Sequence, residues 1–174
     1  VASMVVFEDG KPAKHAYRRF RIKTVEGSND FASLHEVLTR RLERAKSGDV
    51  SFAELPDLFV IDGGKGQLAY AYDAMRSTGY EIPMISLAKR DEEIYRVGIE
   101  PIRLPKSNLA LRLLQRIRDE SHRFAITYHR SLRNRRFESE LRSIEGIGKV
   151  KRASLLRHFK SLEALKRADR AQLM

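Results

Sequence analysis

Short apolar runs alternate with amphipathic stretches along the chain, and their order predicts a mixed α/β fold. An apolar run at residues 4–7 is followed by the turn pair Asp9-Gly10. Along residues 15–24 successive side chains fall on alternate sides of the chain, which predicts a second strand. Together with the turn pair, the two strands predict a β-hairpin. Residues 31–45 carry apolar side chains at helical spacing, which predicts a helix.

Two further apolar runs, residues 58–61 and 83–88, predict buried strands separated by a helix. We expect the first of them in the middle of a sheet. Residues 93–103 indicate a hairpin around Gly98, and a long helix is expected from Asn108. A hairpin followed by strand–helix–strand units favours a mixed sheet covered by helices.

The pattern changes after the long helix. Two short helices are expected around residues 141–144 and 150–159, and a third near Ser161. The sequence therefore predicts one domain over residues 1–137 and a small all-α segment over residues 138–174.

The charge is unevenly distributed. The chain has 174 residues and a net charge of +11, but residues 1–111 hold 17 Lys/Arg against 16 Asp/Glu. Residues 112–174 hold 17 Lys/Arg against 7 Asp/Glu, which indicates a polyanion-binding surface in the last third. A solvated basic face is the alternative for charge alone.

The composition excludes several classes of protein. Cysteine is absent, which rules out disulfides and thiolate zinc sites and fits a reducing cytoplasm. No run of about 18 apolar residues is present, so no membrane span or membrane partner is expected.

Asp62 is the first candidate for chemistry, because it directly follows a predicted buried strand. Open α/β folds place their sites at that edge of the sheet. Lys65 can reach a phosphate as a point charge. A nucleotide-binding P-loop fails, because its first glycine position holds Phe59 and its Ser/Thr position holds Gly66. The alternative role for Asp62 is that of a plain helix cap.

A second cluster contains Asp119, Glu120 and His122 on the long helix, beside its predicted apolar stripe. Asp119 and His122 share a helix face. A structural histidine is the alternative, but oxygen ligands assisted by a histidine would suit a hard metal ion.

A third candidate is the glycine turn before the second short helix. Backbone amides at such a helix start can bind a phosphate, and nearby cations add an electrostatic term. The predicted DNA-binding residues are Gly146, Ile147, Gly148, Lys149, Lys151 and Arg152. An ordinary turn between two helices is the alternative.

Several of these segments together resemble the UvrC family, the nuclease subunits of bacterial nucleotide excision repair. The matching motifs are Ala2-Ser3-Met4-Val5-Val6-Phe7, Tyr17-Arg18-Arg19-Phe20, Asn29-Asp30-Phe31-Ala32, Ile61-Asp62-Gly63-Gly64-Lys65-Gly66-Gln67, Arg118-Asp119-Glu120-Ser121-His122 and Ile144-Glu145-Gly146-Ile147-Gly148. They extend over nearly the whole chain.

The resemblance implies an RNase H-like endonuclease domain followed by a helix-hairpin-helix module, with incision on the 5′ side of a DNA lesion. By matching motif, Asp62 and His122 are expected to bind Mg²⁺ or Mn²⁺ or to act in catalysis. Asp30 corresponds to an acidic position linked to incision, and Lys65 to a supporting phosphate contact. His122 would bind the metal or transfer a proton. The expected partners are damaged double-stranded DNA, UvrB and the UvrA-loaded complex.

The resemblance also leads us to expect a fragment. The strand with the family's first catalytic aspartate would precede residue 1, and a second hairpin would follow residue 174. We therefore expect no cutting by this chain alone. A DNA-binding module without catalysis is the alternative function, and a nucleotide-dependent enzyme is a weaker one.

Overall fold

The computed structural model divides the chain into two compact units, Val1–His122 and Arg123–Met174. It describes residues 2–25, 27, 29–89, 92–159 and 161–169. The division between the units falls inside one long helix. The domain boundary predicted after residue 137 lies further along the same helix and stays a prediction.

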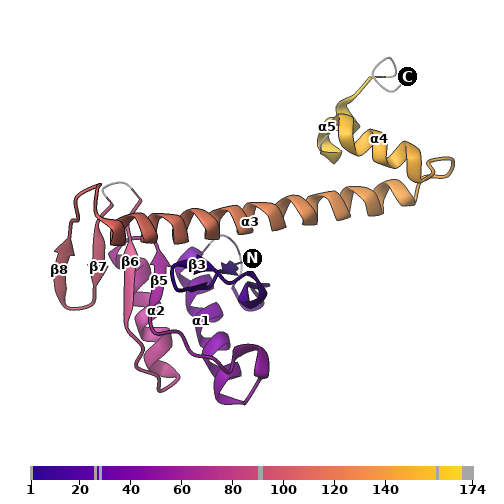
Figure 1. Cartoon of the computed structure of the whole chain (residues 1–174). Helices are drawn as coiled ribbons and strands as arrows, with labels where there is room; N and C mark the ends of the chain where they lie inside the picture. The colour runs from indigo at the N-terminus through magenta and orange to yellow at the C-terminus, as the bar shows by residue number, and fades with distance from the viewer. Residues whose placement is uncertain (1, 26, 28, 90–91, 160, 170–174) are drawn as a thin grey trace. The chain divides into compact units, whose positions relative to one another are not determined.

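The first unit contains every described strand (Figure 1). Its strands are β1 (Ala2–Met4), β2 (Phe7–Glu8), β3 (Lys11–Pro12), β4 (Arg18–Phe20), β5 (Phe59–Asp62), β6 (Met84–Leu87), β7 (Ile94–Arg96) and β8 (Ile99–Ile102). Its helices are α1 (Asp30–Lys46), α2 (Lys65–Ser77), the first part of α3 (Leu109–Arg142) and the short 3-10 turns η1 (Lys14–Ala16) and η2 (Val50–Phe52). Among the described residues no helix combines the length and apolarity needed to cross a membrane.

The N-terminal strands form two antiparallel pairs. β2 and β3 make a tight hairpin whose turn residues Asp9 and Gly10 have φ values of 49° and 71°, the left-handed conformation that this turn type requires. The flanking strands β1 and β4 pair with each other, with Ser3 opposite Arg19. The hairpin prediction is therefore confirmed, with an additional small hairpin inserted at its end.

The main sheet has four strands in the order β5-β6-β7-β8. β5 and β6 are parallel, and the other two pairings are antiparallel, so the sheet is mixed as predicted. The predicted hairpin around Gly98 corresponds to β7 and β8. The prediction of a central position for the strand over residues 58–61 is wrong, because β5 lies at the edge of this sheet within the described residues.

Helices cover both faces of the sheet, and this explains the apolar run in β5. On one face, α1 and α2 pack against Ile61 and Met84. On the other face, Leu111 and Leu114 of α3 pack near Leu87, Val60 and Ile85. A strand covered on both faces is apolar at successive positions wherever it stands in the sheet, so the run indicates burial and not a central place.

The second unit contains the last part of α3 and the helices α4 (Lys149–Phe159) and α5 (Leu162–Arg167). Phe137 and Leu141, four residues apart on α3, are its buried side chains, at 2% and 1% exposure. The short helix predicted around residues 141–144 is wrong, since α3 continues unbroken to Arg142. The predicted third helix is confirmed, with the Ser161 side chain capping α5 by accepting from the Ala164 amide at 3.1 Å.

Candidate active site

Asp62 is the last residue of β5, and strand geometry decides which way its side chain points. Successive side chains of a strand lie on opposite faces, so Asp62 shares a face with Val60. Val60 packs into the cluster beneath α3, and Asp62 is paired with Leu87 of that same cluster across the parallel ladder. The carboxylate is therefore presented on the α3 side, at the carboxyl end of the strand.

His122 reaches the same place from α3. Leu111, Leu114, Arg118 and His122 are spaced by three, four and four residues and form one stripe of the helix. The first two are the buried leucines that cover the sheet, so the stripe carries His122 toward the end of β5. His122 lies beside the predicted stripe of Leu114, Ile117 and Phe124, and on the neighbouring face of α3, which Leu111 turns toward the sheet.

The two side chains meet directly. His122 Nδ1 lies 3.0 Å from Asp62 Oδ2, and the side chains are 42% and 34% exposed. A carboxylate only accepts hydrogen bonds, so a neutral ring in this position would carry its proton on Nδ1 and leave Nε2 unprotonated. Asp119, the other candidate on this helix, is 72% exposed and bonded to Arg118. The described contacts therefore join His122 to Asp62 and keep Asp119 on the surface.

Close packing around the loop after Asp62 requires glycine at two of its positions. A Cβ atom on Gly63 would lie 2.7 Å from Cγ and 2.8 Å from Cβ of Gln67, and one on Gly66 would lie 2.9 Å from the Phe31 ring. The Gln67 side chain turns back to accept from the Gly64 amide at 3.1 Å, which caps α2. The loop is thus built to turn sharply from β5 into α2 directly behind Asp62.

Asp30 lies across a cleft from this loop. It is the first residue of α1, which begins after Asn29 accepts from the Ala32 amide at 3.0 Å. Asp30 and Asp62 both line a cleft of about 470 Å³, together with Ser33 and Gln67. The structure therefore brings the two predicted carboxylates to one cavity.

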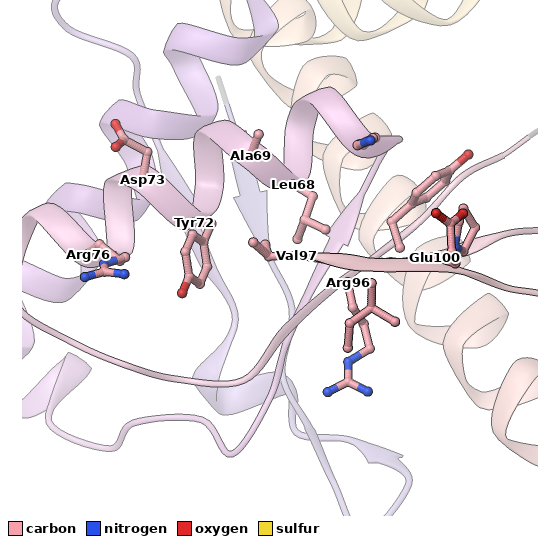
Figure 2. A pocket seen from close by; sticks show the side chains of 13 residues that line it. Leu68, Ala69, Tyr72, Asp73, Arg76, Arg96, Val97 and Glu100 are labelled. Atoms are coloured by element: carbon pink, nitrogen blue, oxygen red, sulfur yellow. The ribbon is translucent and has the colours of Figure 1, made fainter.

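Lys65 is placed elsewhere. It lines a second cavity, of about 580 Å³, between α2 and the β7–β8 hairpin. Figure 2 shows this cavity, with Leu68 and Tyr72 along α2 and Val97 on the hairpin. Lys65 is not among the residues that line the cleft with Asp30 and Asp62.

The sequence did not predict two contacts of basic side chains at this site, one made by Lys89 and one by Arg118. Lys89 Nζ lies 3.4 Å from His122 Nε2. Arg118 Nη1 lies 3.1 Å from both carboxylate oxygens of Glu92. Burial disfavours the charged Arg118 guanidinium, but hydrogen bonds and the charges of Glu92 and Asp119 raise its pKa above the ordinary value. For Lys89 the available signal was the strand–helix–strand order predicted over residues 58–88, since such strands are parallel and the residues that follow both of them meet at one edge.

The side chains that could bind a metal ion at this site provide only part of the ligands that a hard divalent ion needs. Mg²⁺ is commonly held by one or two carboxylates, with water and substrate phosphate completing its shell. Asp62 offers such a carboxylate, and Asp30 lines the same cleft. Across the described residues, however, no three His, Asp or Glu side chains come close enough together to hold a metal ion.

The glycine turn of the second unit connects α3 to α4. Gly146 has a φ of 83°, which only glycine adopts readily. Arg152 donates to the Ile147 carbonyl at 3.0 Å and Lys151 to the Gly146 carbonyl at 3.4 Å, so both side chains fold back on the turn. Lys149, at the start of α4, is exposed.

Comparison with known proteins gives one consistent relationship. The model of the UvrC RNase H endonuclease domain matches residues 1–126. The UvrABC system protein C of Moorella thermoacetica is 52% identical over all of the chain and 29% of its own length. Those of Chlorobium chlorochromatii and Methanosphaera stadtmanae are 50% and 49% identical, over 99% and 97% of the chain. The chain thus spans between 27% and 29% of the length of these three relatives.

Proposed function

The chain belongs to the UvrC family of nucleotide excision repair nucleases, and from this membership we propose that it cuts damaged DNA on the 5′ side of the lesion. The reaction is metal-dependent hydrolysis of a phosphodiester bond, with Mg²⁺ or Mn²⁺. The observation that carries the proposal is the 3.0 Å contact between His122 Nδ1 and Asp62 Oδ2 at the carboxyl end of β5.

Each residue of the site has a role in this proposal. Asp62 would hold the metal ion, and Asp30 would contribute from the same cleft. A bound divalent ion would orient water and neutralise charge on the phosphate. His122 has its Nδ1 fixed on Asp62, so Nε2 is the atom that would bind the metal or accept a proton from water. Lys65, which lines the other cavity, would act as a supporting contact to a phosphate outside this cleft.

DNA would be held by the second unit as well. We propose that α3, the turn at residues 146–148 and α4 form a helix-hairpin-helix module. Gly146 and Gly148 would present backbone amides to a phosphate on either side of Ile147, whose own amide donates to the Ile144 carbonyl at 3.4 Å. Lys149 would lie beside them, with Lys151 and Arg152 behind. The partners would be damaged double-stranded DNA, UvrB and the UvrA-loaded complex, reached through the parts of these longer relatives that lie outside the matched segment.

A DNA-binding module without catalysis is the second candidate. It is favoured by the basic charge of the last third of the chain, where residues 112–174 hold 17 Lys/Arg against 7 Asp/Glu. Under this alternative, Asp62 and His122 would only fix α3 to the end of β5.

Nicking of a damaged duplex separates the two functions. The protein would be a full-length hybrid in which this chain replaces the matching segment of the Moorella thermoacetica relative, and the DNA would be pre-nicked on the 3′ side. UvrA, UvrB and Mg²⁺ or Mn²⁺ are supplied. Asp62→Ala is compared with Asp57→Ala, an exposed aspartate before the other end of β5.

Metal-dependent 5′ cutting that Asp62→Ala abolishes and Asp57→Ala retains would support the nuclease. Equal DNA binding by all three proteins with no cutting by any of them would leave the DNA-binding module. The 174-residue chain, assayed in parallel, tests the expectation that it does not cut alone.

A further inference from the structure

Lys89 lies two residues beyond the end of β6, next to the candidate active site. β6 is the parallel neighbour of β5, and its last residue, Leu87, is paired with Asp62. The residues that follow the two strands therefore emerge at one edge of the sheet. The Lys89 ammonium reaches across this edge to 3.4 Å from His122 Nε2.

The two contacts of His122 are consistent with each other. An ammonium group only donates and a carboxylate only accepts. Lys89 is therefore the donor toward Nε2 at 3.4 Å, while Nδ1 lies 3.0 Å from Asp62 Oδ2. A positive charge is thus held beside the ring nitrogen that faces away from Asp62, where the proposed reaction would take place.

The backbone around Lys89 is fixed on both sides of the undescribed residues 90 and 91. The Ala88 amide donates to the Glu93 carbonyl at 2.9 Å. Glu92 is bound by Arg118, whose side chain is 13% exposed and which lies one helical turn before His122 on α3. The same helix therefore positions both His122 and Glu92.

The charge of Lys89 is available to an anion. Among the ion pairs of the described residues, none involves Lys89, and its side chain is exposed. Lys65, the lysine predicted from the sequence, lines the cavity on the hairpin side of α2 instead. Of these two lysines, Lys89 is the one in contact with the Asp62–His122 pair.

We propose that Lys89 is a catalytic residue that binds a non-bridging oxygen of the scissile phosphate. This inference rests on the proposed nuclease function. On DNA binding, the ammonium leaves His122 Nε2 and pairs with the phosphate, which frees that nitrogen for its own role. A fixed cation at this position stabilises the charge that builds up on the phosphate during cleavage.

The test compares Lys89→Ala and Lys89→Arg with Lys106→Ala. Lys106 is exposed and precedes α3, about 20 Å along the helix axis from His122. In the full-length hybrid, Lys89→Ala is expected to lower the single-turnover incision rate about 100-fold or more, as for loss of one charge-stabilising donor. Lys89→Arg should recover at least a tenth of the rate, and Lys106→Ala should cut normally. Normal cutting by Lys89→Ala, or no recovery by Lys89→Arg, would overturn the proposal.

A second measurement does not need cutting. In EDTA, the affinity of the 174-residue chain for duplex DNA is measured against salt concentration. Loss of one phosphate contact lowers the slope of log affinity against log salt by about 0.9. Of the three variants, only Lys89→Ala is expected to show this change. An unchanged slope for Lys89→Ala would count against a contact between Lys89 and phosphate. If the wild-type hybrid cuts no DNA, the nuclease proposal fails, while the salt slope still decides whether Lys89 touches phosphate.

Discussion

His122 Nδ1 and Asp62 Oδ2 lie 3.0 Å apart, although one residue ends a strand and the other lies in the middle of a long helix. The contact follows from two simple periodicities. Strand alternation directs Asp62 to the α3 face, and the stripe of Leu111, Leu114 and Arg118 carries His122 over the same edge. The packing of α3 on the sheet therefore assembles the pair.

The first prediction concerns the tautomer of His122. In the metal-free chain, the neutral ring should carry its proton on Nδ1, because the Asp62 carboxylate lies 3.0 Å from that atom and Lys89 donates to Nε2. Nitrogen-15 NMR at a pH where the ring is neutral reports this directly. Asp62→Ala should raise the fraction of rings protonated on Nε2, because only the Lys89 contact then favours the Nδ1 tautomer, and Asp119→Ala should leave the ring unchanged. A proton found mainly on Nε2 in the wild type would contradict the arrangement.

The second prediction concerns the loop behind Asp62. Gly63→Ala should destabilise the chain by about 1–3 kcal/mol, as is usual for overpacking a tight site. The new Cβ would lie 2.8 Å from Gln67 Cβ, an atom fixed by the helix backbone, so no side-chain rotation removes the clash. Urea unfolding measures the loss.

Gly64→Ala is the matched control, because its Cβ would meet nothing closer than Gln67 Oε1 at 3.9 Å. It should cost less than about 1 kcal/mol, the ordinary penalty for alanine at a helix cap. Equal losses of stability in the two variants would show that the close approach of Gln67 to Gly63 is not the reason why position 63 requires glycine.

The third prediction concerns the segment that leads from β4 toward Asp30. Glu36 accepts hydrogen bonds from the backbone amides of Lys23 and Thr24, from the Thr24 hydroxyl and from Arg40. Burial raises the pKa of this carboxyl, but the hydrogen bonds outweigh it and hold the pKa at about 2, against an ordinary 4.5. The ionised form is therefore favoured in the folded state. Its stabilisation is fully present above pH 4.5 and is lost as the pH falls toward 2.

Glu36→Gln should accordingly lower the free energy of unfolding by about 1.5–3 kcal/mol at pH 7, the range for hydrogen bonds to a charged group. The difference from the wild type should shrink between pH 4.5 and 2. Glu43→Gln, an exposed position on the same helix, should have no such effect at either pH. A difference that stays constant across this range would exclude the charge of Glu36 as the cause.

Most elements of the fold could be predicted from local signals. Asn29, the glycine turn at Gly98 and the cap at Ser161 each mark an element boundary in the sequence. The edge position of β5 could not be predicted, because its apolar run reflects the helices on both faces and carries no information on its neighbours.

The site was only partly predictable for a related reason. Asp62 and His122 are identified by their motifs, but their contact depends on which stripe of α3 faces the sheet. Two of the four residues on that stripe, Arg118 and His122, are polar, and so the hydrophobic pattern pointed to a neighbouring face. Lys89 belongs to no motif considered in the sequence, and only the pairing of β5 with β6 brings it to His122.

The last prediction separates two basic residues of the turn between α3 and α4. Lys149 is exposed, whereas Arg152 donates to the Ile147 carbonyl at 3.0 Å, and its Nε is buried without a partner among the described residues. Lys149→Ala should therefore lower the salt slope of DNA binding by about 1 with the melting temperature unchanged. Arg152→Ala should destabilise the second unit by about 1–2 kcal/mol, because the carbonyl loses its donor. Thermal unfolding and DNA titrations over a salt series measure both effects. If Arg152→Ala instead keeps its melting temperature and reduces the salt slope as Lys149→Ala does, Arg152 contacts phosphate directly and does not brace the turn.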